Sequence, residues 1–140
     1  MLYHGIGAIR VAALVFAIAT TIFSTAQTMT GGSVAVAFRG EWVPAKSPCT
    51  SPLKLTIGPQ VVKFAKGDDR AEYRNLDQCF TCMGHDVEDI TILSTDAMGD
   101  SPFTIYLDAS KKKPRVTIDF NDTKLGNRFP FGRTALKKCK

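Results

Sequence analysis

Short runs in which apolar and polar residues alternate dominate the chain. The stretches 53–57 and 115–120 alternate strictly, and in the second stretch Val116, Ile118 and Phe120 share one face. A period of two is typical of strands that bury one side. The same reading predicts strand regions at 34–43, 53–57, 61–64, 70–76, 87–94, 103–107, 115–120 and 128–139, the last of them broken near residues 130–132.

Turn-forming residues separate these regions, and no stretch after the first 26 residues shows a convincing helical period. Gly58-Pro59 interrupts the chain between two strands, and the segments 66–69, 96–102 and 121–127 are rich in Gly, Asp, Asn and Ser. Seven or eight short strands with close connections indicate an all-β domain. We predict a small antiparallel barrel, with a sandwich as the alternative.

The first 26 residues have the order of a secretory signal. Arg10 precedes an apolar run, and the small residues at 24–26 follow it. The uncharged run 11–26 has 16 residues, whereas a membrane-spanning helix needs about 20. We therefore predict cleavage after Ala26, with an uncleaved anchor or a buried helix as alternatives. The remainder is a flexible lead at 27–33 and one β domain at 34–140, in a secreted or periplasmic protein.

Four cysteines, Cys49, Cys79, Cys82 and Cys139, are available for cross-links. In a small exported domain an even number of cysteines predicts disulfides that staple the fold. Cys79 and Cys82 are three positions apart, and on an extended strand such side chains point to opposite faces. We therefore expect distant pairing, either Cys49–Cys79 with Cys82–Cys139 or Cys49–Cys82 with Cys79–Cys139. A Cys79–Cys82 bond is the third arrangement.

The same cysteines allow two reactive alternatives. A Cys-x-x-Cys pair is redox-active when its first sulfur lies at a helix N-terminus, but no helix is predicted here. Cys79, Cys82 and His85, with Cys49 or Cys139, would also suit a tetrahedral zinc site, although a second close ligand pair is missing. His85 lies among carboxylates in what we interpret as a solvated turn. No nucleophile elbow, phosphate loop or zinc-protease motif occurs, so we expect no enzyme and no cofactor.

The chain is basic, with a formal net charge of +5 at pH 7. Removal of the signal segment takes away one charge, that of Arg10, and leaves +4. A basic balance favours anionic partners, and outside the cytosol these are an acidic protein, a glycan or an anionic lipid rather than a nucleic acid. The positive residues cluster in two places, which are Lys111, Lys112 and Lys113, and Lys137, Lys138 and Lys140. The first run is most simply a hairpin tip kept soluble by charge, and the alternative is contact with an anionic membrane surface or glycan through these lysines.

The tripeptide Gly-Glu-Trp at 40–42 opens the first strong strand and is similar to the Gly-x-Trp of lipocalins and related calycins. The resemblance implies a barrel in which Trp42 closes one end and packs against an arginine of the last strand, either Arg128 or Arg133. The chain also resembles small periplasmic barrels that inhibit secreted bacterial metalloproteases. Those barrels end in a basic strand, as 133–138 would here, but they have fewer cysteines.

These observations predict an exported, non-enzymatic binding protein. A rigid barrel would present the loop 96–102 and the segment 27–33 to a partner, because loops on a rigid frame usually carry binding. Protease inhibition by insertion of 27–33 is one such mode. The main alternative is a carrier or sensor of a small apolar ligand in the barrel interior, where short strands leave little room. A redox or zinc protein that uses Cys79, Cys82 and His85 is the third hypothesis.

Overall fold

A single antiparallel sheet of ten strands forms the molecule, in the order β1-β6-β7-β8-β9-β10-β2-β3-β4-β5. The computed structural model describes residues 28–30, 32–83, 89–96 and 99–140. The strands are β1 (Thr28–Thr30), β2 (Gly40–Pro44), β3 (Leu53–Ile57), β4 (Val61–Lys66), β5 (Asp69–Arg74), β6 (Asp77–Cys79), β7 (Ile90–Ser94), β8 (Phe103–Asp108), β9 (Arg115–Phe120) and β10 (Leu136–Lys138). Two short helices, η1 (Val36–Phe38) and α1 (Thr123–Arg128), complete the described elements. The all-β prediction is confirmed.

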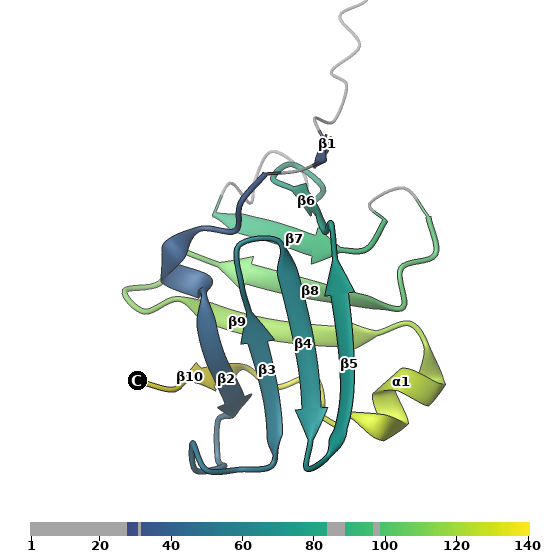
Figure 1. Cartoon of the computed structure of the whole chain (residues 1–140). Coiled ribbons are helices and arrows are strands. Elements are labelled where there is room, and N and C mark those ends of the chain that lie inside the picture. Colours follow the sequence, from purple (N-terminus) through teal and green to yellow (C-terminus); the bar gives the residue numbers. More distant parts are fainter. Residues whose placement is uncertain (1–27, 31, 84–88, 97–98) are drawn as a thin grey trace, which may run out of the picture.

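The sheet curls into a half-barrel (Figure 1). Strands β2 to β5 make one wall, and β7 to β9 run across behind it. The short strand β10 joins the walls, because Leu136 lies opposite both Val116 of β9 and Pro44 of β2. The end strands β1 and β5 each have one hydrogen-bonded neighbour in the described sheet, so the curl is open between them.

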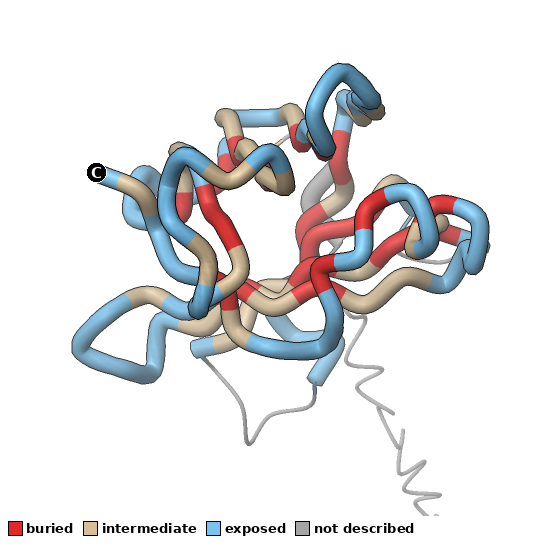
Figure 2. The backbone as a smooth tube through the Cα atoms, turned by 90° about the horizontal axis from the view of Figure 1, so that it is seen from below, coloured by how far each residue is buried: buried red, intermediate tan, exposed pale blue. Residues whose placement is uncertain are grey.

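The core fills the inside of this curl. Phe103, Ile105 and Leu107 of β8 are buried, and the residues between them are half-buried, so the alternation predicted from the sequence is observed. Buried segments lie in the strands around the centre of the curl, and exposed segments lie mostly at turns (Figure 2). Burial of such apolar side chains supplies about 1.5–3 kcal/mol each, which is the main stabilisation of the fold.

An aromatic cluster lies inside the curl, between β4 and β8. The Phe64 ring on β4 is 5.1 Å from that of Phe103, 5.7 Å from that of Phe129 and 6.1 Å from that of Phe131, between ring centroids. Helix α1 lies beside β5 and the end of β9 (Figure 1). The segment that follows α1 therefore packs against β4 through Phe129 and Phe131.

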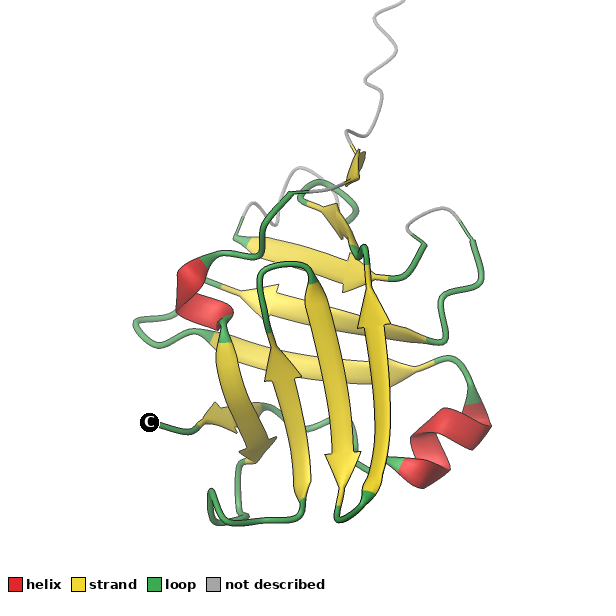
Figure 3. Cartoon of the chain, viewed as in Figure 1, coloured by secondary structure: helices red, strands yellow, loops and turns green. Residues whose placement is uncertain are grey.

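Helix α1 occupies a segment that the sequence predicts as a turn (Figure 3). The side chain of Asp122 caps it by accepting from the backbone N–H of Lys124 at 2.8 Å and of Leu125 at 3.4 Å. The buried Leu125 then holds the helix to the core. Six residues are too short to show a helical period, so the pattern could not predict the element.

Two three-residue strands, β1 and β6, raise the number of strands above the seven or eight predicted. Strand β1 lies within the segment 27–33 that we expected to be flexible, and Thr28 pairs with Cys79 of β6. The Gln78 amide also donates to the Gly32 carbonyl at 2.5 Å. The described part of the lead is therefore held against the sheet, which corrects that prediction.

Other strand boundaries differ from the prediction, most of all in the first and last predicted strands. Strand β2 begins at Gly40 rather than at 34, because η1 occupies 36–38, and the last strand is confined to 136–138. Neither helix in the described parts of the chain has the length and apolar character that crossing a lipid bilayer requires. The predicted signal segment 1–26 lies outside the described residues.

Candidate functional site

The disulfides join Cys49 to Cys139 and Cys79 to Cys82, which is the third arrangement, so both pairings that we expected are wrong. Cys79 is the last residue of β6, and Cys82 lies in the turn that follows. The chain has left the extended conformation between them, so their side chains are no longer on opposite faces, and their Cα atoms are 5.6 Å apart. That separation suits a disulfide.

The Cys49–Cys139 bond connects two segments that the sheet already places side by side. Residue 49 follows β2 in the chain, residue 139 follows β10, and β2 pairs with β10. The backbone N–H of Cys139 also donates to the Glu41 carbonyl at 2.8 Å. Sequence separation alone could not reveal this proximity, because it depends on the pairing of the last strand with the first wall.

All four cysteines are oxidised, so none is available as a zinc-binding thiolate. His85, the third ligand of the zinc alternative, lies outside the described residues. Across the described ranges, no group of three His, Cys, Asp or Glu side chains is arranged to hold a metal ion. The structure thus gives the cysteines a structural role.

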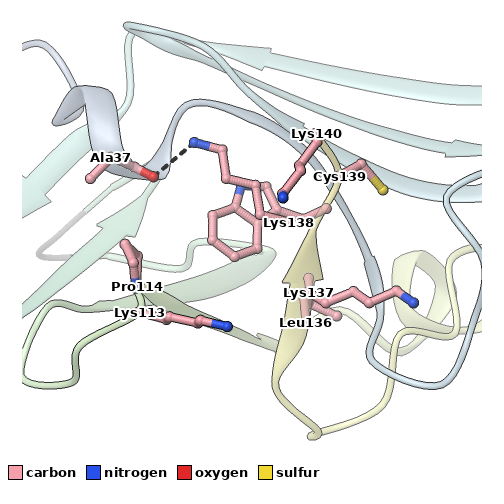
Figure 4. A pocket seen from close by; sticks show the side chains of 9 residues that line it. Ala37, Lys113, Pro114, Leu136, Lys137, Lys138, Cys139 and Lys140 are labelled. Carbon is pink, nitrogen blue, oxygen red and sulfur yellow. Dashed lines mark hydrogen bonds between the residues drawn. The ribbon is translucent and has the colours of Figure 1, made fainter.

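A pocket of about 640 Å³ lies between η1, β2, β10 and the β8–β9 connection, and we call it the lysine pocket (Figure 4). Apolar groups form part of its wall, and four of its nine lining residues are lysines. The lining residues are Ala37, Trp42, Lys113, Pro114, Leu136, Lys137, Lys138, Cys139 and Lys140.

Strand pairing brings the two basic clusters of the sequence together at this pocket. Lys113 lies just before β9, and Lys137 and Lys138 belong to β10, which pairs with β9 and with β2. Lys113 therefore meets the lysines near the C-terminus, although more than twenty positions separate them in the sequence. Lys111 and Lys112 are exposed in the same connection. The clusters were visible in the sequence, but their convergence was not.

Trp42 is buried at the wall of the pocket. Its indole N–H donates to the Phe38 carbonyl at 2.8 Å. The Lys138 ammonium lies 5.8 Å from the centroid of the indole ring and donates to the Ala37 carbonyl at 2.9 Å. The cation over the tryptophan is thus a lysine of the last strand.

The two arginines predicted for this role have other partners. Arg128 donates to Asp69 at 2.6 Å and stacks over the ring of Phe129, at 5.0 Å from its centroid. Arg133 lies 3.0 Å from Asp119. Arg128 thus fastens α1 to the start of β5, and neither arginine lines the lysine pocket. The prediction of an arginine over Trp42 is corrected to Lys138.

The lysine pocket has an excess of positive charge. Lys113 and Lys140 extend toward the pocket from opposite sides, whereas Lys137 is directed away from it (Figure 4). In the described part of the chain, none of the four pocket lysines forms an ion pair with a carboxylate. Clustered charges of one sign beside low-dielectric walls concentrate counter-ions. The pocket is therefore suited to an anionic group.

The carboxyl groups with clearly shifted pKa values lie elsewhere on the surface. Hydrogen bonding to Arg128 lowers the pKa of Asp69, and Lys63 does the same for Glu72. A hydrogen bond from the Ser110 hydroxyl lowers the pKa of Asp108. Each shift favours the charged form of a carboxylate in an exposed contact, which is the behaviour of structural partners.

The predicted binding loop 96–102 is anchored at its end by a buried hydroxyl. Ser101 accepts from the backbone N–H of Thr95 at 3.0 Å and donates to the Phe103 carbonyl at 2.6 Å. A shallow pocket of about 390 Å³ lies between residues 99–102 and 121–122. Residues 97–98 of the loop lie outside the described part. The lysine pocket is larger than this shallow pocket, at about 640 Å³ against 390 Å³, and its lining carries several positive charges.

No protein-family model, curated protein or solved structure matches the chain. The resemblance to calycins therefore stays a prediction based on the tripeptide 40–42 and the basic end of the chain. A functional assignment therefore rests on the two disulfides and the lysine pocket.

Proposed function

We propose that the protein is an exported binding protein without catalytic activity, which binds the acidic group of its partner at the lysine pocket. The observation that carries this proposal is the convergence of Lys113 with Lys138 and Lys140 around a hollow that Trp42 and Leu136 line. The ammonium groups of these lysines repel one another, and an anionic group bound in the pocket would offset this repulsion.

Two disulfides place the folded chain in an oxidising, non-cytosolic compartment, because cytosolic thiols are kept reduced. Export by the predicted signal 1–26 fits this location. The anionic partners present there are acidic proteins, glycans and lipids, the same classes that the net charge favours.

The absence of catalysis is supported by how the reactive side chains are used. The cysteines are bonded to one another, and the shifted carboxyl groups of Asp69 and Glu72 are in ion pairs with basic residues. A catalytic site would need a nucleophile and a base within hydrogen-bonding reach of each other. The lysine pocket lining provides ammonium groups and apolar surface instead.

An interior apolar ligand, the main alternative, is less well supported. The inside of the curl is occupied by buried side chains from both walls and from the aromatic cluster around Phe64. An acidic protein partner would use the lysine pocket from outside, and inhibition of such a partner stays a prediction. The segment 27–33 is less free to enter a protease cleft than we expected, since β1 pairs with β6.

Trp42 is the only tryptophan of the chain and lines the lysine pocket, so its fluorescence reports directly on occupancy. The test titrates the oxidised protein with three anionic probes: polyglutamate, heparin and octanoate. We expect at least one probe to give a saturable change in fluorescence that weakens as salt is raised. The double variant K113A/K140A should bind that probe about tenfold or more weakly.

Lys124→Ala is the matched control, because it removes the same kind of charge from α1, an element outside the lysine pocket. Its affinity should stay within about twofold of the wild type. The proposal fails if no probe binds at low salt, or if K113A/K140A and K124A weaken binding equally.

A further inference from the structure

The lysine pocket has two kinds of surface that a single ligand must satisfy. Trp42, Pro114 and Leu136 provide apolar groups, and Lys113 and Lys140 extend toward the pocket from its sides. Its volume of about 640 Å³ falls within the range of about 300–1,000 Å³ that is usual for small-molecule sites. A polyanion would need only an exposed charged surface, so the apolar part of this lining favours a ligand with an apolar part of its own.

Lys138 completes the apolar side of the pocket rather than its charged rim. Its ammonium is already fixed on the Ala37 carbonyl, and it lies over the Trp42 ring. The long aliphatic stem of a lysine held in this way covers apolar surface. Lys113 and Lys140 are the ammonium groups that remain to meet an acid, and they approach from opposite sides (Figure 4).

We propose that the occupant of the lysine pocket is an amphipathic anion, a molecule with an apolar body and one terminal acid group. The apolar body would lie against Ala37, Pro114 and the aliphatic stem of Lys138, which covers the buried Trp42. The acid group would lie between Lys113 and Lys140. This inference rests on the proposed function and names its ligand class. The acid is a carboxylate or a phosphate, carried either by a free amphiphile or by a lipid of a membrane.

Three small probes separate the apolar contribution from the charged one. Octanoate carries both features, 1-octanol has the chain without the charge, and acetate has the charge without the chain. Each buried methylene adds about 0.8 kcal/mol, so burial of a few of them gives octanoate an affinity at least about tenfold higher than that of acetate. The acid group should give octanoate a similar advantage over 1-octanol. Trp42 fluorescence measures all three affinities.

Substitution of the lysines tests whether the acid group of the ligand lies between Lys113 and Lys140. K113A/K140A should weaken octanoate binding about tenfold or more and leave 1-octanol binding within about twofold, because the apolar surface remains. Lys124→Ala should leave both affinities unchanged. Thermal unfolding of each variant shows whether it is folded, and Lys113 and Lys140 are exposed, so their removal should cost little stability.

Several results would overturn the amphipathic ligand. Polyglutamate or heparin binding through Lys113 and Lys140 in the absence of octanoate binding would leave the proposed function intact and refute this inference. Equal binding of octanoate by the wild type and K113A/K140A would also refute it. Vesicles of phosphatidylglycerol, compared with phosphatidylcholine, separate the two sources of the ligand. Vesicle binding without octanoate binding would show that the lysines contact a membrane surface and that the pocket takes no amphiphile.

Discussion

Trp42 is the residue at which the core and the lysine pocket meet. The buried ring packs within the core cluster, and its N–H holds the Phe38 carbonyl at the end of η1. The next carbonyl before it, that of Ala37, binds Lys138. One side chain thus orients the short helix that fixes a lysine of the last strand.

Replacement of Trp42 by Phe should cost about 1–3 kcal/mol of unfolding free energy, because the Phe38 carbonyl loses its donor and the ring volume shrinks. Urea unfolding followed by circular dichroism measures this change. Val36→Ala on the same short helix is the control, since Val36 is 70% exposed and its truncation should stay within about 0.5 kcal/mol. An equal effect of the two substitutions would contradict the structural role of the indole N–H.

Asp69 gives the protein a contribution to stability that depends on pH. Its bond to Arg128 lowers the pKa of the carboxyl below the ordinary value of 3.8. A group whose pKa is lower in the folded state stabilises the fold above its unfolded pKa and loses this contribution as the pH falls through its folded pKa. The wild type should therefore exceed Asp69→Asn in unfolding free energy near neutral pH.

The difference between the two proteins should shrink as the pH falls below about 4. Urea unfolding at a series of pH values measures it. Asp68→Asn is the control, because it removes the same charge from the neighbouring turn, and in the described part of the chain Asp68 is in no ion pair. It should lower the unfolding free energy near neutral pH less than Asp69→Asn does. If the unfolding free energies of the wild type and D69N diverged further as the pH fell, the contact with Arg128 would not lower the pKa of Asp69.

Strand β10 is the element on which the lysine pocket depends most. It has only three residues, yet it joins the two walls and carries Lys137 and Lys138. Its pairing is limited to three positions with β2 and one with β9. The Cys49–Cys139 bond follows directly after it and holds this short strand in place.

Removal of the Cys49–Cys139 bond should destabilise the protein more than removal of the Cys79–Cys82 bond. The sequence separations are 90 and 3. Chain-entropy arithmetic gives upper values of about 4.6 and about 1.6 kcal/mol for loops of these lengths. Guanidinium unfolding of the double serine variants C49S/C139S and C79S/C82S measures the two effects.

The two serine variants should also differ in binding, because Cys139 lies between Lys138 and Lys140. C49S/C139S should weaken the response of Trp42 to anionic probes under conditions in which it is still folded, and C79S/C82S should not. If C79S/C82S lost more unfolding free energy than C49S/C139S, the bond in the turn after β6 would stabilise the fold more than the bond between Cys49 and Cys139, which would contradict the stability prediction.

Elements whose signal is local were predictable from the sequence. Strand β9 has the predicted bounds, because Val116 and Ile118 alternate with polar residues and face the core. Helix α1 has no such signal, because about a turn and a half of helix gives no period and Asp122, its cap, is equally typical of a turn. Strand β10 is shorter than predicted, since Phe129 and Phe131 are used for the aromatic cluster.

At the scale of the whole molecule, the fold class could be read from the sequence and the site could not. Alternation and turn residues are local, and they indicate an antiparallel all-β domain. The disulfide partners and the lysine pocket depend instead on which strands become neighbours, above all on the position of β10 between β9 and β2. The sequence marked Lys113 and Lys138 as basic, but strand pairing over long distances decides that they share a pocket.

The oxidation state of the four cysteines links the folded protein to the compartment in which it occurs. If the chain is exported as proposed, we expect the mature protein to begin near Gln27 and to contain no free thiol, since all four cysteines are paired and the preceding segment has the order of a signal. The measurement is the intact mass of the exported protein after alkylation without reductant, under native and denaturing conditions. Two alkylated cysteines would show that one bond is open in the exported protein. If these were Cys79 and Cys82, the pair would become a candidate for redox chemistry. A retained zinc ion would show instead that cysteines bind a metal rather than form disulfides.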